Sequence, residues 1–435
     1  MKKLSLIFSL QIFSSQVSFS QVWQQLPNAP AAEFVNDDIF FVDENKGWMV
    51  NLDGFIYRTQ DGGDSWDTLL IQPGTAFRSI CFVDSLHGFA GNLGPGSWIS
   101  NITDTIALYE TVDGGVNWTP VTTINGTYPA GICGIILVNE NVIYAVGRYA
   151  GPCVYLKTTD GGATWNSTNM MSEYQNLIDV YFFSADTGII VGGKNGFSKI
   201  SYTTDGGNNW QTVFTSNEVS TWHWKISFPS RMIGYVSIEG GNGTNSRVAK
   251  TIDGGLTWQL LPLNYPNDID ATGIGFINDT VGWVGCWYPG VDYMTTDGGM
   301  TWSLYPLDPS FNRFRRVSAT TAYICGESVW KYNIPLDTTT LVIPKEKPGY
   351  QLEQNSPNPF TDKTAITYII PEKGFVTLKV FDSGGRTVKT MVKEIQEAGT
   401  YTYIVELPNL ASANFYCKLS VNGNKKVIKM IMIKE

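Results

Sequence analysis

Three aspartates stand where apolar strands of a repeated pattern begin, and they are the residues of this chain best placed for acid–base chemistry: Asp38, Asp179 and Asp270. Two carboxylates that face each other across a cleft can hydrolyse a glycosidic bond, one as the acid and the other as the base or nucleophile. Single aspartates at strand entrances also accept hydrogen bonds from nearby backbone groups and so cap turns. Catalysis by these residues is therefore the alternative to a structural role.

Cationic and aromatic residues form a second candidate set. Some lie at strand entrances and others in irregular loops between strands, and the set is Arg78, Trp98, Arg148, Tyr149, Trp287, Tyr288, Arg315 and Arg316. Such side chains on loops of a rigid scaffold suit recognition of a sugar or a protein. The other interpretation is that the aromatic side chains pack onto the ends of the strands, because single exposed apolar residues are common.

Several other chemistries are excluded by the residue types. The six cysteines have no CxxC spacing, which argues against a zinc or redox motif, and two histidines in 435 residues make a histidine-based metal site or triad improbable. We predict no metal and no cofactor. Residues 350–435 carry 11 Lys/Arg against 8 Asp/Glu, so a net charge of −9 leaves −12 for residues 1–349. An acidic surface repels phosphate backbones, so nucleic acid is not an expected partner.

The elements that position these residues follow from an eight-residue string, Thr-x-Asp-Gly-Gly-x-x-Trp, that occurs six times. Its aspartates are Asp61, Asp113, Asp160, Asp205, Asp253 and Asp297, separated by 52, 47, 45, 48 and 44 residues. This spacing is typical of one four-stranded propeller blade. Asp-Gly-Gly suits a tight hairpin, in which the carboxylate accepts hydrogen bonds from the turn. We assign these aspartates a structural role, since a calcium loop needs several oxygens at one site.

A second repeated element precedes the hairpins and occurs seven times: an apolar strand, a short polar turn and another apolar strand, beginning at Phe41, Phe82, Leu137, Phe182, Phe228, Phe276 and Val317. The last copy has no hairpin after it. Residues Val22–Pro27 resemble the outer strand at Thr257–Pro262, so they can complete the last blade and leave no open sheet edge. The sequence therefore predicts a seven-bladed β-propeller over residues 21–334.

The N-terminus has the parts of a secretory signal peptide. Met1-Lys2-Lys3 precedes an apolar run, Leu4–Phe13, and small residues favour cleavage between Ser20 and Gln21. That run is too short to span a bilayer, and no later segment is long and apolar enough to do so. We therefore expect an exported protein with no transmembrane helix and a signal peptide over residues 1–20.

A Pro/Thr-rich stretch over residues 335–349 predicts an extended linker. Short alternating strands follow and predict a small Ig-like β-sandwich over residues 350–435; they are Ala365–Ile370, Val376–Phe381, Thr387–Val392, Gly399–Leu407, Asn414–Val421 and Lys426–Ile433. The whole chain is accordingly assigned to the all-β class.

Residues 350–435 resemble the type A sorting domain of the type IX secretion system of Bacteroidota. The resemblance rests on Leu352-Glu-Gln-Asn-Ser-Pro-Asn-Pro-Phe360, on Val376-x-Leu-x-Val-Phe-Asp382 with Gly385-Arg386, and on Ala398-Gly399. One difference is Ala413, where the family has glycine before an aromatic residue. The resemblance implies passage through the periplasm, recognition by the type IX machinery, and secretion or display on the outer membrane.

Residues 21–334 resemble the Asp-box (BNR-type) propellers, and their long Thr-x-Asp-Gly-Gly-x-x-Trp form is most similar to the photosystem II stability/assembly factor group. Sialidases, xyloglucanases and sortilin-type receptors share this fold, so the resemblance implies an architecture and not one activity. We expect a binding module for a protein or glycan on the loop-rich face, opposite the Asp boxes. The alternative is a xyloglucanase- or sialidase-like hydrolase.

Overall fold

The computed structural model describes residues 23–433, apart from the following short segments: 33–34, 98, 100, 149–150, 242–244, 264–269, 287–290, 306–310, 334–349, 383–385, 408–412 and 423. The expected signal peptide of residues 1–20, its cleavage site at Ser20 and Gln21, and the expected linker of residues 335–349 lie outside the described residues. Within the described ranges we find no helix long and apolar enough to cross a membrane.

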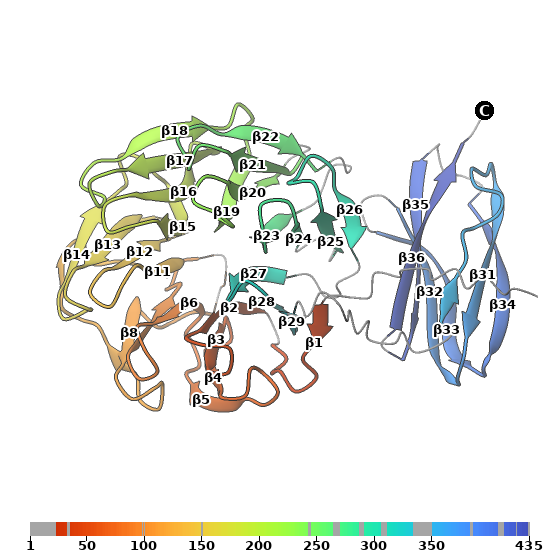
Figure 1. Ribbon diagram of the computed structural model, residues 1–435, viewed down its shortest axis with the longest axis horizontal. Helices are drawn as coiled ribbons and strands as arrows, with labels where there is room; N and C mark the ends of the chain where they lie inside the picture. The colour runs from red at the N-terminus through yellow and green to blue at the C-terminus, as the bar shows by residue number, and fades with distance from the viewer. Residues whose placement is uncertain are drawn as a thin grey trace, which may run out of the picture.

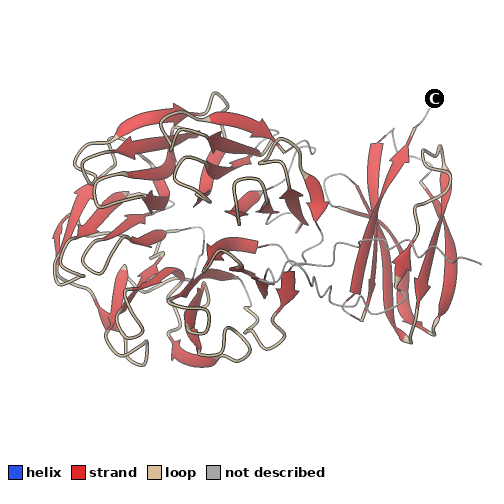
Figure 2. Cartoon of the chain, viewed as in Figure 1, coloured by secondary structure: helices blue, strands red, loops and turns tan. Residues whose placement is uncertain are grey.

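Residues 23–333 form a ring of small twisted sheets around a common centre (Figure 1). Figure 2 shows strands joined by loops, and the described part of the chain contains no helix. The first strands of neighbouring sheets contact one another around the ring, from β2 (Asn36–Phe41) against β6 (Phe77–Phe82) to β27 (Phe311–Arg316) back against β2. The all-β class and the propeller fold predicted from the sequence are confirmed.

The described residues of the ring contain seven sheets, which we number as blades one to seven. Their strands, from the inside outward, are β2 (Asn36–Phe41), β3 (Gly47–Asn51), β4 (Phe55–Thr59) and β5 (Asp67–Ile71) in blade one; β6 (Phe77–Phe82), β7 (Gly88–Asn92), β8 (Leu108–Thr111) and β9 (Thr119–Pro120) in blade two; β11 (Gly134–Leu137), β12 (Ile143–Gly147), β13 (Val154–Thr158), β14 (Trp165–Asn169) and β10 (Ile124–Gly126) in blade three; and β15 (Asn176–Phe182), β16 (Gly188–Lys194), β17 (Phe197–Thr203) and β18 (Gln211–Thr215) in blade four. The remaining strands are β19 (Thr221–Ser227), β20 (Gly234–Gly240), β21 (Arg247–Thr251) and β22 (Gln259–Pro262) in blade five; β23 (Ala271–Phe276), β24 (Gly282–Cys286), β25 (Val291–Thr295) and β26 (Ser303–Tyr305) in blade six; and β27 (Phe311–Arg316), β28 (Thr321–Gly326), β29 (Val329–Asn333) and β1 (Trp23–Gln25) in blade seven.

The N-terminal strand supplies the outer strand of blade seven. β1 pairs antiparallel with β29, with Trp23 opposite Tyr332. The Trp23 side chain is buried, and its ring packs edge-on against Trp283 of blade six at a centroid distance of 5.2 Å. The last blade is thus completed by the N-terminal strand of the propeller. An aromatic contact joins this outer strand to blade six.

The Phe-x₅-Gly spacing of the repeat has a steric cause. In blade four, Gly188 at the start of β16 lies opposite Phe182 at the end of β15, and a Cβ at Gly188 would lie 2.5 Å from Phe182 Cδ1. The space left by the glycine is filled by the Phe182 ring, which stacks on Tyr144 of blade three at 3.6 Å between centroids. The same arrangement joins Trp48 to Phe82, also at 3.6 Å. The glycine therefore makes room for a ring that binds one blade to the next.

Each Asp box closes its hairpin with a fixed set of hydrogen bonds. In the fourth box, Asp205 accepts from Thr203 Oγ1 at 2.8 Å, from the Asn209 backbone N–H at 2.9 Å and from Asn209 Nδ2 at 2.7 Å. Gly207 has a φ of 86°, and a Cβ there would lie 2.2 Å from Tyr155 Oη of the preceding blade. Glycine is therefore required at this position both by the turn and by the close packing of the preceding blade.

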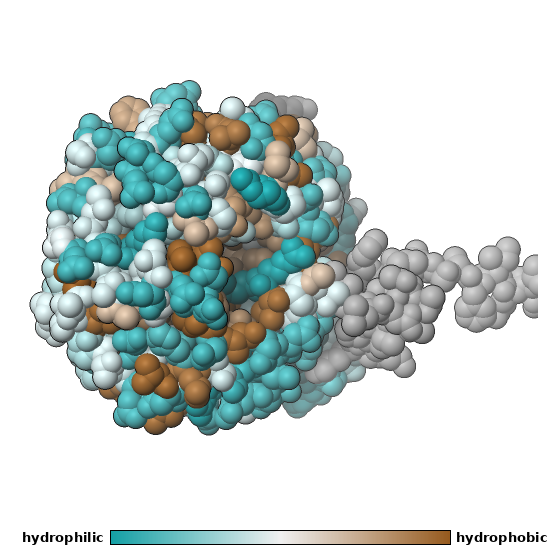
Figure 3. All heavy atoms as spheres, turned by 60° about the vertical axis from the view of Figure 1, so that its left-hand side comes forward, coloured by the Kyte–Doolittle hydropathy of each residue, from teal (hydrophilic) through white to brown (hydrophobic). Residues whose placement is uncertain are grey.

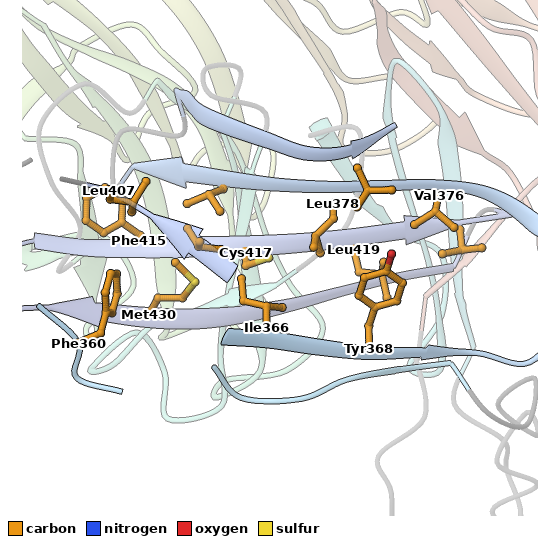
Figure 4. Packing of buried hydrophobic residues seen from close by; sticks show 14 of the residues in the cluster. Phe360, Ile366, Tyr368, Val376, Leu378, Leu407, Phe415, Cys417, Leu419 and Met430 are labelled. Carbon is orange, nitrogen blue, oxygen red and sulfur yellow. The ribbon is translucent and has the colours of Figure 1, made fainter. Parts of the chain in front are cut away.

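Residues 350–433 form a separate β-sandwich. One sheet contains β30 (Gln351–Leu352), β31 (Lys363–Ile370) and β34 (Gly399–Glu406), and the other contains β33 (Thr387–Gln396), β32 (Gly374–Asp382), β35 (Ala413–Val421) and β36 (Asn424–Met432). Alternate residues of these strands point between the two sheets, where Ile366, Leu378 and Leu419 meet (Figure 4). The sandwich core contains only residues of this segment, so it is independent of the cores of the ring.

Candidate functional site

Six inner strands in the described part of the propeller carry β-bulges near their first residues. The pairing of β2 with β3 shifts between Asn36 and Asp38, and the pairing of β6 with β7 shifts between Phe77 and Ser79. Similar shifts occur in β15, β19, β23 and β27. A bulge leaves an extra residue outside the ladder and changes the direction of its side chain. Asp37 and Arg78 are such residues, and the bulges thereby bring polar side chains to the centre of the ring.

The polar side chains at the centre form an ion-pair network that we call the axial cluster. Its members come from blades one, two, four, five and seven and are Asp37, Asp38, Arg78, Asp179, Lys225 and Arg313. Asp37 Oδ2 accepts from Arg78 Nη1 at 2.8 Å, and Asp37 Oδ1 lies 3.8 Å from Lys225 Nζ. Asn312 Nδ2 also donates to Asp37 Oδ1, at 2.8 Å. Asp37 therefore joins three inner strands.

Arg313 joins the other two carboxylates of the cluster. Its Nε lies 3.2 Å from Asp38 Oδ1, and its Nη1 lies 3.1 Å from Asp179 Oδ2. Asp38 is also bound by Arg315, whose Nη2 lies 2.9 Å from Asp38 Oδ2. Backbone N–H groups complete both sites, from Ile80 to Asp38 and from Ile226 to Asp179. Each carboxylate is thus held by a guanidinium and by the backbone of another strand.

The axial cluster is buried, and burial acts on the pKa values of Asp38 and Lys225. Its side chains are at most 6% exposed. Burial alone would raise the pKa of Asp38, but the neighbouring Arg313 and Arg315 hold that pKa below its usual value. Burial lowers the pKa of Lys225 to about 8, and the positive charges of Arg313 and Arg78 act in the same direction. The carboxylate of Asp38 is therefore ionised, and Lys225 is the member of the cluster whose charge is easiest to remove.

The three candidate catalytic aspartates have different surroundings. Asp38 and Asp179 are both bound to Arg313 inside the axial cluster, and their side chains are 0% and 6% exposed. Asp270 is partly exposed and directly precedes β23, where its charge adds to the effect of burial in raising the pKa of Glu239. The structure therefore joins Asp38 to Asp179 through a guanidinium and places Asp270 beside another carboxylate.

The described candidate ligand-binding residues also lie in different places. Arg78 belongs to the axial cluster, and Arg148 is 6% exposed, where it donates to the carbonyl oxygens of Pro95, Ala130 and Gly151. Arg315 and Arg316 are the last residues of β27, at the end that leads to β28; Arg315 binds Asp38, and Arg316 is exposed and donates to the Pro229 carbonyl. The aromatic candidates lie outside the described residues: Trp98, Tyr149, Trp287 and Tyr288.

A carboxylate missed by the sequence interpretation lies at the end of β20. Trp224 Nε1 donates to Glu239 Oε2, and the guanidinium of Arg78 lies 5.4 Å from the centroid of the Trp224 ring. Burial and, secondarily, the charge of Asp270 raise the pKa of Glu239 to about 7. Trp224 and Lys225 both fall within the bulge of β19, between His223 and Ile226. The sequence signal for this region was the run Trp222-His-Trp-Lys225 in β19, which puts charged and aromatic residues in one inner strand.

The Asp boxes carry a second set of perturbed carboxylates. Hydrogen bonds from Asn209 and Thr203 lower the pKa of Asp205 to about 2, and Asp61, Asp160 and Asp297 have pKa values of about 2 for the same type of reason. Each box holds one carboxylate whose acceptor sites are used by its own turn. Among the described residues, no group of three or more His, Cys, Asp or Glu side chains could hold a metal ion.

Family models match two parts of the chain. Residues 356–434 match the secretion system C-terminal sorting domain, and residues 293–304 match the BNR/Asp-box repeat. The chain therefore carries an Asp-box repeat and ends in a sorting domain of the type IX secretion system, which confirms both resemblances. None of the curated proteins matches the chain significantly.

Solved structures resemble the chain at low sequence identity. YCF48 from Cyanidioschyzon merolae has a TM-score of 0.56 at 17% identity, over 72% of this chain and 98% of YCF48. A GH74 xyloglucanase from Xanthomonas campestris has a TM-score of 0.54 at 10% identity, over 94% of this chain and 67% of the enzyme. PorZ, a surface component of the type-IX secretion system of Porphyromonas gingivalis, has a TM-score of 0.51 at 12% identity, over 94% of this chain and 61% of PorZ. Identities this low establish the propeller fold alone.

Proposed function

We propose that the propeller is a binding module for a protein or carbohydrate ligand, exported first by its signal peptide and then by its sorting domain, and that it works outside the cell or on its surface. The sorting domain supports the second export step. The Lys-Lys and apolar segments at the N-terminus support the first. The linker over residues 335–349 would separate the binding module from the export signal.

The observation that carries this proposal is the state of the two carboxylates at the propeller centre. Asp38 and Asp179 are buried acceptors whose oxygens are bound by Arg313 and by backbone N–H groups. A glycosidase acid must hold a proton, and a base must reach a water or a sugar carbon. Neither requirement is met by a buried carboxylate bound to a guanidinium, so these residues support a scaffold and not a catalytic pair.

The loop-rich face is the surface that we assign to the ligand. Loops between the second and third strands of blades two, three and six carry aromatic residues, and those between blades connect to the inner strands. A solved YCF48 structure contains a bound D1 peptide, and xyloglucanases act on a polysaccharide, so propellers of this fold accept both ligand classes. Aromatic side chains provide large contact areas at small entropic cost. We propose that Trp98, Tyr149, Trp287 and Tyr288 provide such contacts.

Glycan and peptide arrays, probed with the full mature chain, test the proposal. Binding that weakens at least tenfold in the double variant Trp287→Ala/Tyr288→Ala would support it. The matched control is Ile252→Ser, which changes an exposed apolar residue in the Asp box of blade five, on the opposite face. If Ile252→Ser lost binding and the double variant kept it, the ligand would bind the face that carries the Asp boxes, and the proposal would be refuted.

The alternative function, glycoside hydrolysis, is favoured by one observation. Glu239 has a pKa raised to about 7, as a general acid requires, and Asp270 is near enough to contribute to that shift. In this alternative Glu239 protonates the leaving oxygen and Asp270 acts as the base or nucleophile. Hydrolysis of xyloglucan or a sialoside that disappears in Glu239→Gln and persists in Glu110→Gln would replace the binding proposal.

A further inference from the structure

Three cations of the axial cluster have N–H groups that lack an acceptor. Within the described part of the chain, no hydrogen-bond acceptor is present for Lys225 Nζ, Arg78 Nε or Arg313 Nη2. These side chains are only 1%, 2% and 5% exposed. A buried charged donor without an acceptor carries a large desolvation cost. The centre of the propeller therefore presents unused, strongly polarised donors that favour a negatively charged partner.

The three cations also converge on one region although they come from blades two, five and seven. Asp37 lies 2.8 Å from Arg78 and 3.8 Å from Lys225, so it brings these two side chains together. Arg313 contacts Asp179, and the charges of both Arg313 and Asp179 act on Lys225. Cations packed at such separations repel one another in a medium of low polarity.

The carboxylates do not fully balance this positive charge. Among the described residues, the cluster and the Arg315 bound to it contain four cations and three carboxylates: Arg78, Lys225, Arg313 and Arg315 against Asp37, Asp38 and Asp179. One added negative charge would balance the four cations against the carboxylates. A small oxyanion supplies this charge and several acceptor oxygens for the unused donors.

We propose that the axis of the propeller binds one small oxyanion, held by Lys225 Nζ together with Arg78 Nε and Arg313 Nη2. Sulfate, phosphate and simple carboxylates share the required chemistry. The anion contacts three blades that are not neighbours in the ring, so its binding stabilises the assembled ring against opening. This site is separate from the ligand proposed for the loop-rich face, and it stands whichever function that face has.

Thermal unfolding of the full mature chain at constant ionic strength tests the site. Sodium chloride is replaced in low-millimolar steps by sulfate, phosphate or acetate, which distinguishes a tetrahedral anion from a carboxylate. We expect the melting temperature to rise by a few degrees and then saturate, as binding to one site requires. The rise should shrink as the pH increases through about 8, where Lys225 loses its charge. A shift that grows linearly with every salt, without saturation, would refute the site.

The variant Lys225→Met removes the central donor and keeps much of the side-chain volume, and it should abolish the saturable rise. The matched control is Lys199→Met, since Lys199 is paired with Glu173 outside the axial cluster and its loss should leave the rise intact. An equal response in wild type and Lys225→Met overturns the proposal.

A crystal of the wild-type chain soaked in selenate gives a test that requires no folded variant. An anomalous peak at the axis, within hydrogen-bond distance of Lys225 Nζ, supports the proposal. Water alone at that position, or peaks elsewhere that indicate an adventitious ion only, would overturn it.

Discussion

At the scale of single residues, the repeat contains a matched pair. Phenylalanine stands at the end of the first strand of a blade, and glycine stands at the start of the second. Gly188 has ordinary backbone geometry, so its role is to leave space for the Phe182 ring. Blades three and seven lack the pair: Leu137 faces Ile143, and Arg316 faces Ala322. The glycine therefore occurs where the large ring occurs, which indicates that it is selected by packing.

Gly188→Ala should lower the free energy of unfolding by about 1–3 kcal/mol, because the added Cβ would overlap the Phe182 ring. Chemical denaturation of both single variants and of Gly188→Ala/Phe182→Leu measures the effect. The double variant replaces the ring with leucine, the residue that blade three has at this position, and should lose less than the sum of the two single losses. Strict additivity would show that the two residues do not interact.

The Asp boxes make the propeller sensitive to acid. The pKa of Asp205 is about 2 in the folded chain, and an unfolded aspartate has a pKa of about 3.9. A folded-state pKa below the unfolded value gives stability that is complete above the unfolded pKa and is lost as the pH falls toward the folded one. The melting temperature should therefore fall between about pH 4 and pH 2, since several boxes share this property.

Variants of the fourth Asp box test whether its hydrogen bonds cause this acid response. Asp205→Ala should lower the melting temperature by roughly 2–4 °C near neutral pH, and the difference from wild type should narrow as the pH falls toward 2. Asn209→Ser is the control, because Ser65 donates from the same position to Asp61 at 2.5 Å in the first box. A difference that stays constant with pH would contradict the assigned cause.

At the scale of elements, much of the fold could be predicted because it depends on local repeats. The six strands expected in the C-terminal segment all overlap strands of the sandwich within a few residues. Blade seven differs in register: Arg316 lies opposite Ala322, one residue before the position expected from Val317. Blade seven lacks the Phe-Gly pair, so its sequence contained no marker of that register. In the folded chain the geometry of the turn fixes the register.

The axial cluster could not be predicted, although three of its members, Asp38, Arg78 and Asp179, were among the candidate residues. Asp38 and Arg315 are 277 residues apart in sequence, and their contact depends on closure of the whole ring. The bulges that direct Asp37 and Arg78 inward arise from pairing between strands, and a single strand does not encode them. Sequence alone therefore identified some of the charges, missed Asp37 and Arg313, and did not show which side chains form ion pairs.

The N-terminal strand is the element on which ring closure depends. Trp23→Ala should destabilise the propeller by about 3–5 kcal/mol, because it removes a buried ring that packs on Trp283 and Tyr332. Gln24→Ala changes an exposed residue of the same strand and is the control.

Deleting residues 21–27 should cause a larger loss of stability and also aggregation, because the edge of β29 becomes available for pairing with other chains. Unchanged melting after this deletion would show that β1 is dispensable.

At the scale of the whole molecule, the chain contains two folding units with separate tasks. The sandwich core is made of residues 350–432, and the cores of the ring are made of residues before 334. The surface visible in Figure 3 is mainly hydrophilic, with hydrophobic side chains in small scattered groups. A large apolar patch is a typical sign of an obligate partner, and the described residues on the face shown do not form one.

Because no core is shared, deleting residues 350–435 should leave a folded propeller that fails to cross the outer membrane. The expected result is accumulation in the periplasmic fraction, with the melting transition of the propeller unchanged. Asn355→Ala is a milder version of the same test. Asn355 is buried and donates to Thr364 Oγ1 at 2.9 Å, so its loss should destabilise the sandwich and reduce export while every propeller residue is retained. The exposed Gln351→Ala should be exported normally. Normal secretion of the truncated chain would contradict the role of the sorting domain, and a lowered propeller melting temperature would contradict the independence of the two cores.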